Sequence, residues 1–206
     1  MMPLLALAIA YLVGGVPFGY LLVRFKTGED VRTLGSGNIG ATNVLRTAGG
    51  GIAIATLVLD ILKGFLAVWC AALLTGHSDL WMSAAALAVM AGHAYPVFLK
   101  FQGGKAVASF VGAFLYLTPL ALAVTLVLFV IVVAVTKQIS MGSLVGAGAL
   151  PLAVYLILHP AAPVVFAALI AGAFIICRHS SNIRRIRAGT ENVFRFRGGH
   201  PGRAHS

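Results

Sequence analysis

Acidic side chains are scarce in this chain. Its 206 residues include five Asp and Glu against fifteen Lys and Arg, and charged residues of both signs make up 10% of the sequence. Mg²⁺ and Ca²⁺ bind to sets of oxygen ligands, largely carboxylates, and the sequence has no cluster of acids to supply them. It also has no set of His and Cys that suits zinc. We therefore expect no metal site and no other cofactor.

Cysteine is scarce as well. Cys70 and Cys177 lack the C-x-x-C spacing of a redox or metal site. They also fall towards opposite ends of long apolar runs, so we expect no disulfide between them. The G-x-S-x-G motif that presents a nucleophilic serine is absent too. These absences point away from redox, metal and serine-hydrolase chemistry.

Hydrophobic residues, in contrast, make up 60% of the chain. They gather into runs whose lengths are typical of membrane-spanning helices, which need about 20 residues each. The runs are Pro3–Val23, Ile52–Leu74, Leu80–Leu99, Ala106–Val135, Ile139–Leu158 and Ala161–Cys177. The sequence predicts an all-α integral membrane protein with a single membrane domain over residues 1–194, followed by a short, basic, disordered tail over residues 195–206.

The run Ala106–Val135 decides the topology. It is too long for one comfortable helix and short for two, and Thr118-Pro119 lies at its middle. Cytoplasmic loops carry the excess of Lys and Arg. If the run crosses the membrane twice and turns near Thr118-Pro119, every basic loop falls on one side. This predicts seven transmembrane helices, with the N-terminus outside and the C-terminus cytoplasmic, some of them short or partly interfacial.

Three short polar stretches interrupt the apolar chain, and this topology places all of them on the cytoplasmic face. They extend over Ser36–Arg46, Gly92–Lys105 and Arg178–Glu191. Each combines glycine, a hydroxyl or amide, and a cation, which are the groups that bind phosphate. The net charge of +10 is also typical of nucleic-acid binding. Because the basic residues lie at the ends of apolar runs, anionic lipids and phosphorylated substrates are favoured as partners, and nucleic acid is not expected.

The first stretch begins with a turn sequence, Gly35–Asn38. Glycines allow successive N–H groups to converge into an anion-binding nest. Ser36 and Asn43 could add hydrogen bonds, and Arg46 could clamp two phosphate oxygens. A flexible loop of ordinary turn residues would have the same composition. No Lys-Ser or Lys-Thr follows Gly40, so the stretch is not an ATP-binding P-loop.

The second stretch ends in Gly103-Gly104-Lys105 at the start of a predicted helix. A glycine pair at a helix N-terminus would expose free N–H groups and the positive end of the helix dipole, and Lys105 adds a full charge. Anchoring of the span by Lys100 and Lys105, with His93 as an ordinary interfacial histidine, is the alternative interpretation.

The third stretch follows the last apolar run. His179 and Asn182 are spaced to share one face of a helical turn, and a histidine there could transfer protons or bind phosphate. Arg184, Arg185 and Arg187 are interpreted as a lipid-facing basic cluster. Glu191 lies among arginines, which favours an orienting salt bridge over catalysis.

Asp60 and Lys63 lie within the second apolar run, three residues apart. Charges inside a membrane are costly and often functional. A paired Asp and Lys can also be an internal strut between helices, and we favour the strut.

Taken together, the stretches resemble the bacterial acyl-phosphate:glycerol-3-phosphate acyltransferases of the PlsY type. The matching segments are GSGNIGATNVLR at 35–46, LDILKG at 59–64, GHAYPVFLKFQGGKAVA at 92–108 and RHSSNIRRIRAGTEN at 178–192. Family members often carry Lys and Gly where this chain has Gln102 and Ala106. Each motif is weak alone, but all of them in this order are specific.

The resemblance implies transfer of a fatty acyl group from acyl phosphate to the 1-hydroxyl of glycerol 3-phosphate, the first step of phospholipid synthesis. The products would be lysophosphatidic acid and phosphate. The H-x-x-x-x-D motif of acyl-CoA-dependent acyltransferases is absent, so the donor is not expected to be acyl-CoA. The resemblance also implies a metal-independent enzyme, a monomer in the bacterial inner (plasma) membrane, with its active site on the cytoplasmic face and with membrane lipids around it.

Site residues follow from the same resemblance. The catalytic residues would be Ser36, Arg46, Lys105, His179 and Asn182. The other substrate-binding residues would be Gly37, Asn38, Thr42, Asn43, Gly103, Gly104 and Glu191. Two proton acceptors stay open: the His179 side chain and the phosphate of bound glycerol 3-phosphate.

Two other functions suit a small basic membrane protein. One is a transporter for a phosphorylated solute, with Asp60 and Lys63 in its pathway, but transporters contain inverted repeats and the sequence has no internal repeat. The other is a membrane interaction protein, which would not need three stretches rich in Gly, Asn, Ser and His. The sequence favours the acyltransferase over both.

Overall fold

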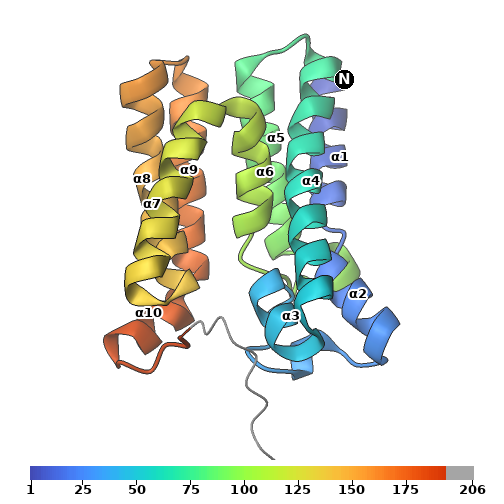
Figure 1. The fold of residues 1–206 in the computed structure, drawn as a ribbon. Coiled ribbons are helices and arrows are strands. Elements are labelled where there is room, and N and C mark those ends of the chain that lie inside the picture. Colours follow the sequence, from blue (N-terminus) through green and yellow to red (C-terminus); the bar gives the residue numbers. More distant parts are fainter. Residues whose placement is uncertain (194–206) are drawn as a thin grey trace, which may run out of the picture.

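The computed structural model describes residues 1–193, and all regular structure in this part of the chain is helical (Figure 1). The predicted tail over residues 195–206 lies outside the described residues. In chain order the helices are α1 (Met2–Gly14), α2 (Phe18–Thr27), η1 (Val31–Thr33), α3 (Ala41–Ala48), α4 (Gly50–Thr75), α5 (Asp79–Ala94), η2 (Val97–Leu99), α6 (Val107–Leu117), α7 (Pro119–Thr136), α8 (Ile139–Leu158), α9 (Ala162–Arg178) and α10 (Ser180–Arg187).

Several of these helices are long and apolar enough to cross a membrane. Five segments meet this description, and α9 with α10, bent by 60° at their junction, makes a sixth. The five are Met2–Thr27, Gly50–Thr75, Asp79–Leu99, Pro119–Thr136 and Ile139–Leu158. Their outward side chains are apolar and exposed, as on α7, where Val130 is 61% exposed. A chain with this pattern is an all-helical membrane protein, as predicted.

The long apolar run divides into two helices at the predicted place. α6 ends at Leu117 and α7 begins at Pro119, which occupies the first helical position, where its missing N–H has no partner to lose. Figure 1 shows the chain rising through α6, turning at the top of the view and descending through α7. α6 has only 11 residues, which at about 1.5 Å per residue is shorter than a bilayer core.

Small residues allow α6 to pack closely against α4. A side chain at Gly112 would collide with the carbonyl of Ile61, and one at Gly64 would collide with the carbonyl of Ser109. Close backbone approach at glycine is the usual way in which membrane helices associate, because lipid supplies no hydrophobic drive between them. The reciprocal glycines fix the depth of α6 and of the loop that precedes it.

All three polar stretches lie at one end of the bundle, at the bottom of Figure 1, where α2, α3 and α10 are found. A small second core holds part of this end together. Its buried members include Val23 of α2, Val31 of η1, Val44 of α3 and Leu99 of η2. The loops therefore have a packed base on which polar side chains can be positioned.

Candidate functional site

The first polar stretch is organised around the buried side chain of Asn43. The Oδ1 atom of Asn43 accepts the N–H of Ser36 at 2.8 Å. Its Nδ2 atom donates to the carbonyl oxygens of Val31, Leu34 and Asn38 at 2.9 to 3.2 Å. Because the backbone of the loop engages both polar atoms of this amide, we revise the predicted role of Asn43 from binding substrate to holding the loop in shape.

The free N–H groups of the first stretch lie at the start of α3 and not at the predicted glycine turn. Gly37 adopts a φ of 71°, but its N–H donates to the carbonyl of Leu34 at 2.9 Å and is not free. Asn38 caps the following turn, since its Oδ1 accepts the N–H of Gly40 at 2.9 Å. The first N–H groups of a helix have no helical acceptor. The donors that this end of the loop offers to an anion are therefore those of Ala41 and Thr42.

Ser36 and Arg46 lie on the outer side of the same loop and helix. Both residues are exposed, and within residues 1–193 neither side chain makes a hydrogen bond. The charge of Arg46 acts on the ammonium of Lys105, which places α3 beside the second stretch. The hydroxyl of Thr42 is likewise without a hydrogen bond within residues 1–193, so Ser36, Thr42 and Arg46 are the predicted residues of this stretch whose side chains can meet a ligand directly.

The glycine pair of the second stretch serves close packing. The N–H of Gly103 donates to the carbonyl of Ala94 at 3.2 Å, and that of Gly104 donates to the carbonyl of His93 at 3.1 Å. In this structure these two N–H groups are therefore engaged by the backbone and are not free for a phosphate. The donors left free at this helix N-terminus begin at Val107, in the first turn of α6.

Lys105 lies at the centre of the site. Its Nζ donates to the Oδ1 of Asn182, which joins the second stretch to the third. Burial lowers the pKa of Lys105 to about 8, and the nearby charges of Arg185, Arg46 and Arg178 act in the same direction, while Glu191 opposes them. A half-buried cation among other cations is short of negative charge and attracts an anion.

Glu191 orients Asn182 on the far side of this contact. Its Oε1 accepts the Nδ2 of Asn182 at 2.7 Å and the Oγ of Ser140 at 2.9 Å, and its Oε2 accepts the Nε of Arg185 at 2.8 Å. Burial opposes ionisation, but these hydrogen bonds hold the pKa of Glu191 below its usual value. The predicted orienting salt bridge is confirmed.

Two features of this arrangement differ from the sequence interpretation. Arg185 faces Glu191 and not the lipid. Ser140, at the start of α8, was not predicted at all. The one signal for it in the sequence is its place at the first turn of a helix that follows Lys137, on the same side as the polar stretches.

His179 lies at the junction of α9 and α10 and is buried. Its Nδ1 is 2.8 Å from the carbonyl oxygen of Ile175 and can only donate to it, which leaves Nε2 for other chemistry. The neighbouring Arg178 donates from Nε and Nη2 to the carbonyl of Gly104, at 3.2 and 3.0 Å, and stacks on the ring of Tyr95 at 4.9 Å. α9 is thereby tied to the glycine turn of the second stretch.

Asp60 and Lys63 form the predicted pair inside the bundle, with 2.7 Å between Nζ and Oδ1. Each side chain is 3% exposed. His93 approaches the same Asp60 oxygen at 3.7 Å through Nδ1. The ring of His93 lies against Gly104, and within residues 1–193 no hydrogen bond or ion pair joins this group to Lys105.

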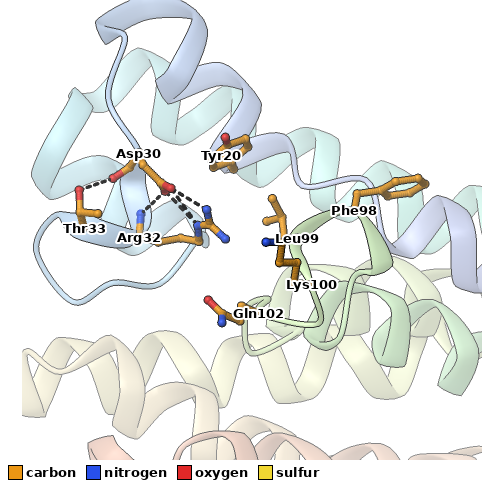
Figure 2. A pocket seen from close by; sticks show the side chains of 8 residues that line it. All are labelled: Tyr20, Asp30, Arg32, Thr33, Phe98, Leu99, Lys100 and Gln102. Atoms are coloured by element: carbon orange, nitrogen blue, oxygen red, sulfur yellow. Dashed lines mark hydrogen bonds and ion pairs between the residues drawn. The ribbon is translucent and has the colours of Figure 1, made fainter.

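A cavity of about 530 Å³ lies at a different place, and none of the predicted site residues lines it (Figure 2). Asp30 and Arg32 stand on one side of it, and Leu99 and Lys100 stand on the other. Arg32 is held by Asp30 at 2.6 Å and over the ring of Tyr20 at 5.2 Å. The hydrogen bond from Arg32 lowers the pKa of Asp30, so this charge pair is satisfied within the wall.

A much smaller cavity, of about 30 Å³, lies between α6, α7 and α8. Its lining is mainly apolar and includes Val107, two residues after Lys105.

Several known proteins are similar to this chain. The family model described as glycerol-3-phosphate acyltransferase matches residues 4–201. A glycerol-3-phosphate acyltransferase of Geobacter sulfurreducens is 46% identical over 93% of this chain and 97% of its own length. The corresponding protein of Geobacter metallireducens is 49% identical over 93% of this chain and 97% of its own length.

Solved structures are similar to it as well. The fold is similar to that of PlsY, an integral membrane glycerol 3-phosphate acyltransferase, in its glycerol 3-phosphate form, with a TM-score of 0.90 and 33% identity over 95% of this chain and 96% of the other. The lysophosphatidic acid form of PlsY gives a TM-score of 0.86 and 31% identity, with the same coverage.

Proposed function

The chain belongs to the glycerol-3-phosphate acyltransferase family of the PlsY type, and we propose that it transfers a fatty acyl group from acyl phosphate to the 1-hydroxyl of glycerol 3-phosphate. The hydroxyl oxygen forms an ester bond with the acyl carbon, and the bond from that carbon to the phosphate oxygen breaks. The products are 1-acyl-glycerol 3-phosphate and inorganic phosphate. The solved relatives in a glycerol 3-phosphate form and a lysophosphatidic acid form support this pair of substrate and product.

The observation that carries the proposal is the position of Lys105. Within residues 1–193 its ammonium contacts an amide and no carboxylate, within reach of the charges of Arg46 and Arg178. Both substrates bear phosphate, and cations with amide and hydroxyl donors are the groups that hold it. Ser36, Arg46, Lys105 and Asn182 would bind the phosphates, with N–H donors from the first turns of α3 and α6.

The reaction needs little beyond positioning and charge stabilisation. Acyl phosphate is a mixed anhydride whose phosphate leaves readily, so direct attack by the hydroxyl requires neither an acyl-enzyme nor acyl-CoA nor a metal. The proton of the hydroxyl passes to Nε2 of His179 or to a substrate phosphate. A His179→Gln variant distinguishes the two, because it removes the first acceptor and leaves the second.

The acyl chain would lie between the membrane-spanning helices, with its carbonyl at the level of Lys105. We propose that the domain over residues 1–194 crosses the membrane seven times, through α1, α4, α5, α6, α7, α8 and α9. The N-terminus would lie outside and the site on the cytoplasmic face of the bacterial inner membrane, because the basic loops lie at one end of the bundle. The protein would act as a monomer, since one chain supplies every proposed site residue.

The test uses the purified full chain in detergent. Phosphate release from palmitoyl phosphate is measured with and without glycerol 3-phosphate, and palmitoyl-CoA is offered as an alternative donor. We expect phosphate release that depends on glycerol 3-phosphate and is lost in Lys105→Ala, and we expect no ester to form from the CoA donor. No release by folded protein would refute the proposal, and uptake of glycerol 3-phosphate into sealed vesicles would then support a transporter.

A further inference from the structure

The buried charges of the bundle interior have no part in the chemistry above, yet they lie directly behind the turn that carries Lys105. Lys63 pairs with Asp60 and also donates to the carbonyl of Val16, at the junction of α1 and α2, at 2.9 Å. Its ammonium lies 5.5 Å from the centre of the Phe18 ring. The pair therefore connects α4 to the point where the chain turns out of α1.

His93 connects this pair to the glycine turn. The Nδ1 edge of its imidazole approaches Asp60, with 3.7 Å between Nδ1 and Oδ1. The opposite edge abuts Gly104 so closely that a Cβ on that residue would collide with Nε2. The carbonyl of His93 also accepts the N–H of Gly104 at 3.1 Å. His93 thus contacts Gly104 through both its ring and its backbone.

The turn is held from the other side as well. The guanidinium of Arg178 donates twice to the carbonyl of Gly104, which leaves the peptide of this residue clamped between α5 and α9. The next residue is Lys105. A displacement of Gly104 would therefore move the ammonium of Lys105 relative to Asn182.

Stability alone does not account for a charged group at this depth. Desolvation of two buried charges largely offsets their attraction, so apolar side chains of similar volume would serve packing as well or better. What apolar side chains would not supply is a fixed orientation for the imidazole between Asp60 and Gly104.

We propose that His93 is a positioning residue, which fixes the Gly103–Lys105 turn and with it the ammonium of Lys105, and that the Asp60–Lys63 pair holds His93 in orientation. This inference rests on the proposed function, because it takes Lys105 to be the residue that meets substrate phosphate. It turns the strut predicted from the sequence into a support for the site.

The first test compares two truncations in α5. His93→Ala removes the ring behind Gly104. Met90→Ala removes a fully buried side chain of similar size one turn earlier, away from the turn. We expect His93→Ala to lower kcat/KM for glycerol 3-phosphate by about 100-fold, as a misplaced binding group does, while Met90→Ala stays within about twofold. His93→Gln, which keeps the volume against Gly104, should recover part of the loss. Equal kcat/KM values for His93→Ala and Met90→Ala would overturn the proposal.

The second test is a double-mutant cycle between His93 and Gly104. Gly104→Ala should impair the wild-type protein, because the new methyl group meets the imidazole. In the His93→Ala background the same change should have little further effect on kcat/KM or on the thermal unfolding midpoint. Additive effects would show that the two residues act independently and would contradict the proposal.

The third test removes both buried charges together. Asp60→Asn combined with Lys63→Met leaves no unpaired charge, so a simple strut would keep full activity in this variant. We expect a loss of about tenfold in kcat/KM, since His93 loses its orienting partner.

The outcomes separate the two proposals. An inactive wild-type protein refutes the acyltransferase, whereas an active wild type with an unaffected His93→Ala refutes only the positioning role.

Discussion

Two lysines in this protein lie close to carboxylates, and they differ in what stands between the opposite charges. Inside the bundle, the Nζ of Lys63 lies 2.7 Å from the Oδ1 of Asp60 with no group between them. At the end of the bundle, Asn182 separates Lys105 from Glu191, accepting from the first and donating to the second. The direct pair satisfies its own charges. The interrupted pair leaves the ammonium of Lys105 available to an anion from outside.

The neighbours of each carboxylate reinforce this difference. The carboxylate of Asp60 lies beside the side chains of Lys63 and His93, and all three residues are buried. Glu191 accepts hydrogen bonds from Ser140, Asn182 and Arg185, and the guanidinium of Arg185 balances its charge. Its role towards Lys105 is to orient the side-chain amide of Asn182. A lysine becomes structural or functional here according to its nearest partner, and not according to the depth of burial alone.

The largest effect is expected where the direct pair is broken. Asp60→Asn should destabilise the protein by about 3–5 kcal/mol, because Lys63 is left as an unpaired buried charge. The measurement is the free energy of unfolding in detergent. The double variant with Lys63→Met should recover most of this loss. Equal stabilities of the single and double variants would show that the two charges are not a pair.

Removal of the cation from the interrupted pair should affect activity and spare stability. Lys105→Met is expected to lower kcat/KM by about 10²–10³-fold, the usual cost of losing one charge-stabilising group. Lys100→Met, which removes an exposed cation from the same loop, should stay near the wild-type value. A similar loss in both variants would mean that general electrostatic attraction, and not a specific contact, accounts for the role of Lys105.

A substitution at Asn182 that replaces its amide nitrogen by oxygen can also remove the difference between the Lys63 and Lys105 sites. Asn182→Asp places a carboxylate directly on Lys105 and makes this contact resemble the one at Lys63. We expect kcat/KM to fall by about 10–100-fold, because the new carboxylate competes with substrate phosphate for Lys105 and can no longer donate to Glu191, whose like charge it faces. Steady-state kinetics with glycerol 3-phosphate measures this. An unchanged KM would indicate that the amide is not near the bound phosphate.

The pH dependence should report the state of Lys105. Its pKa is lowered to about 8, so the ammonium is present below pH 8 and is lost above it. We expect kcat/KM to be level up to about pH 8 and then to fall by about tenfold per pH unit, since this ratio reports groups of the free enzyme. In Lys105→Met that decline should disappear. A decline that persists in the variant would belong to another group.

The smallest effect concerns the shape of the turn that carries Lys105. Ala106 adopts a φ of 62°, a conformation that costs an L-residue about 1–2 kcal/mol relative to glycine. Ala106→Gly should therefore raise the free energy of unfolding by up to about 1 kcal/mol, the smaller figure allowing for the greater freedom of glycine in the unfolded chain. Thermal unfolding measures the gain. Destabilisation by this change would show that the methyl group of Ala106 contributes packing that outweighs the strain.

Much of the fold was predictable because it depends on local composition. The apolar runs marked the spans, and Thr118-Pro119 marked the break between α6 and α7, since proline can begin a helix but not continue one. Asp60 and Lys63 were predictable as a pair because residues three apart share a helix face.

The site was predictable only in part. Lys105, Asn182 and Glu191 were identified through a resemblance, and the structure brings them together in one chain of hydrogen bonds. The hydrogen-bond partner of each N–H and amide group was not predictable. In the structure the N–H groups of Gly37, Gly103 and Gly104 and the side-chain amide of Asn43 bond to the backbone of the protein and are not free for a ligand. Ser140 was missed because a lone serine at a helix start has no distinctive pattern.

The sequence by itself determined that this is a helical membrane protein whose candidate phosphate-binding residues gather in three polar stretches, because hydrophobicity, charge and glycine content are properties of short segments. Only the tertiary structure decided that Lys105 is left open, because its partner Asn182 lies 77 residues further along the chain. Lys63 and Lys105 have the same side chain, and the difference between them is whether a carboxylate or the amide of Asn182 lies against the ammonium. The contact of Lys63 lies within α4, whereas the contact of Lys105 is made only because the fold brings the loop before α6 against α10.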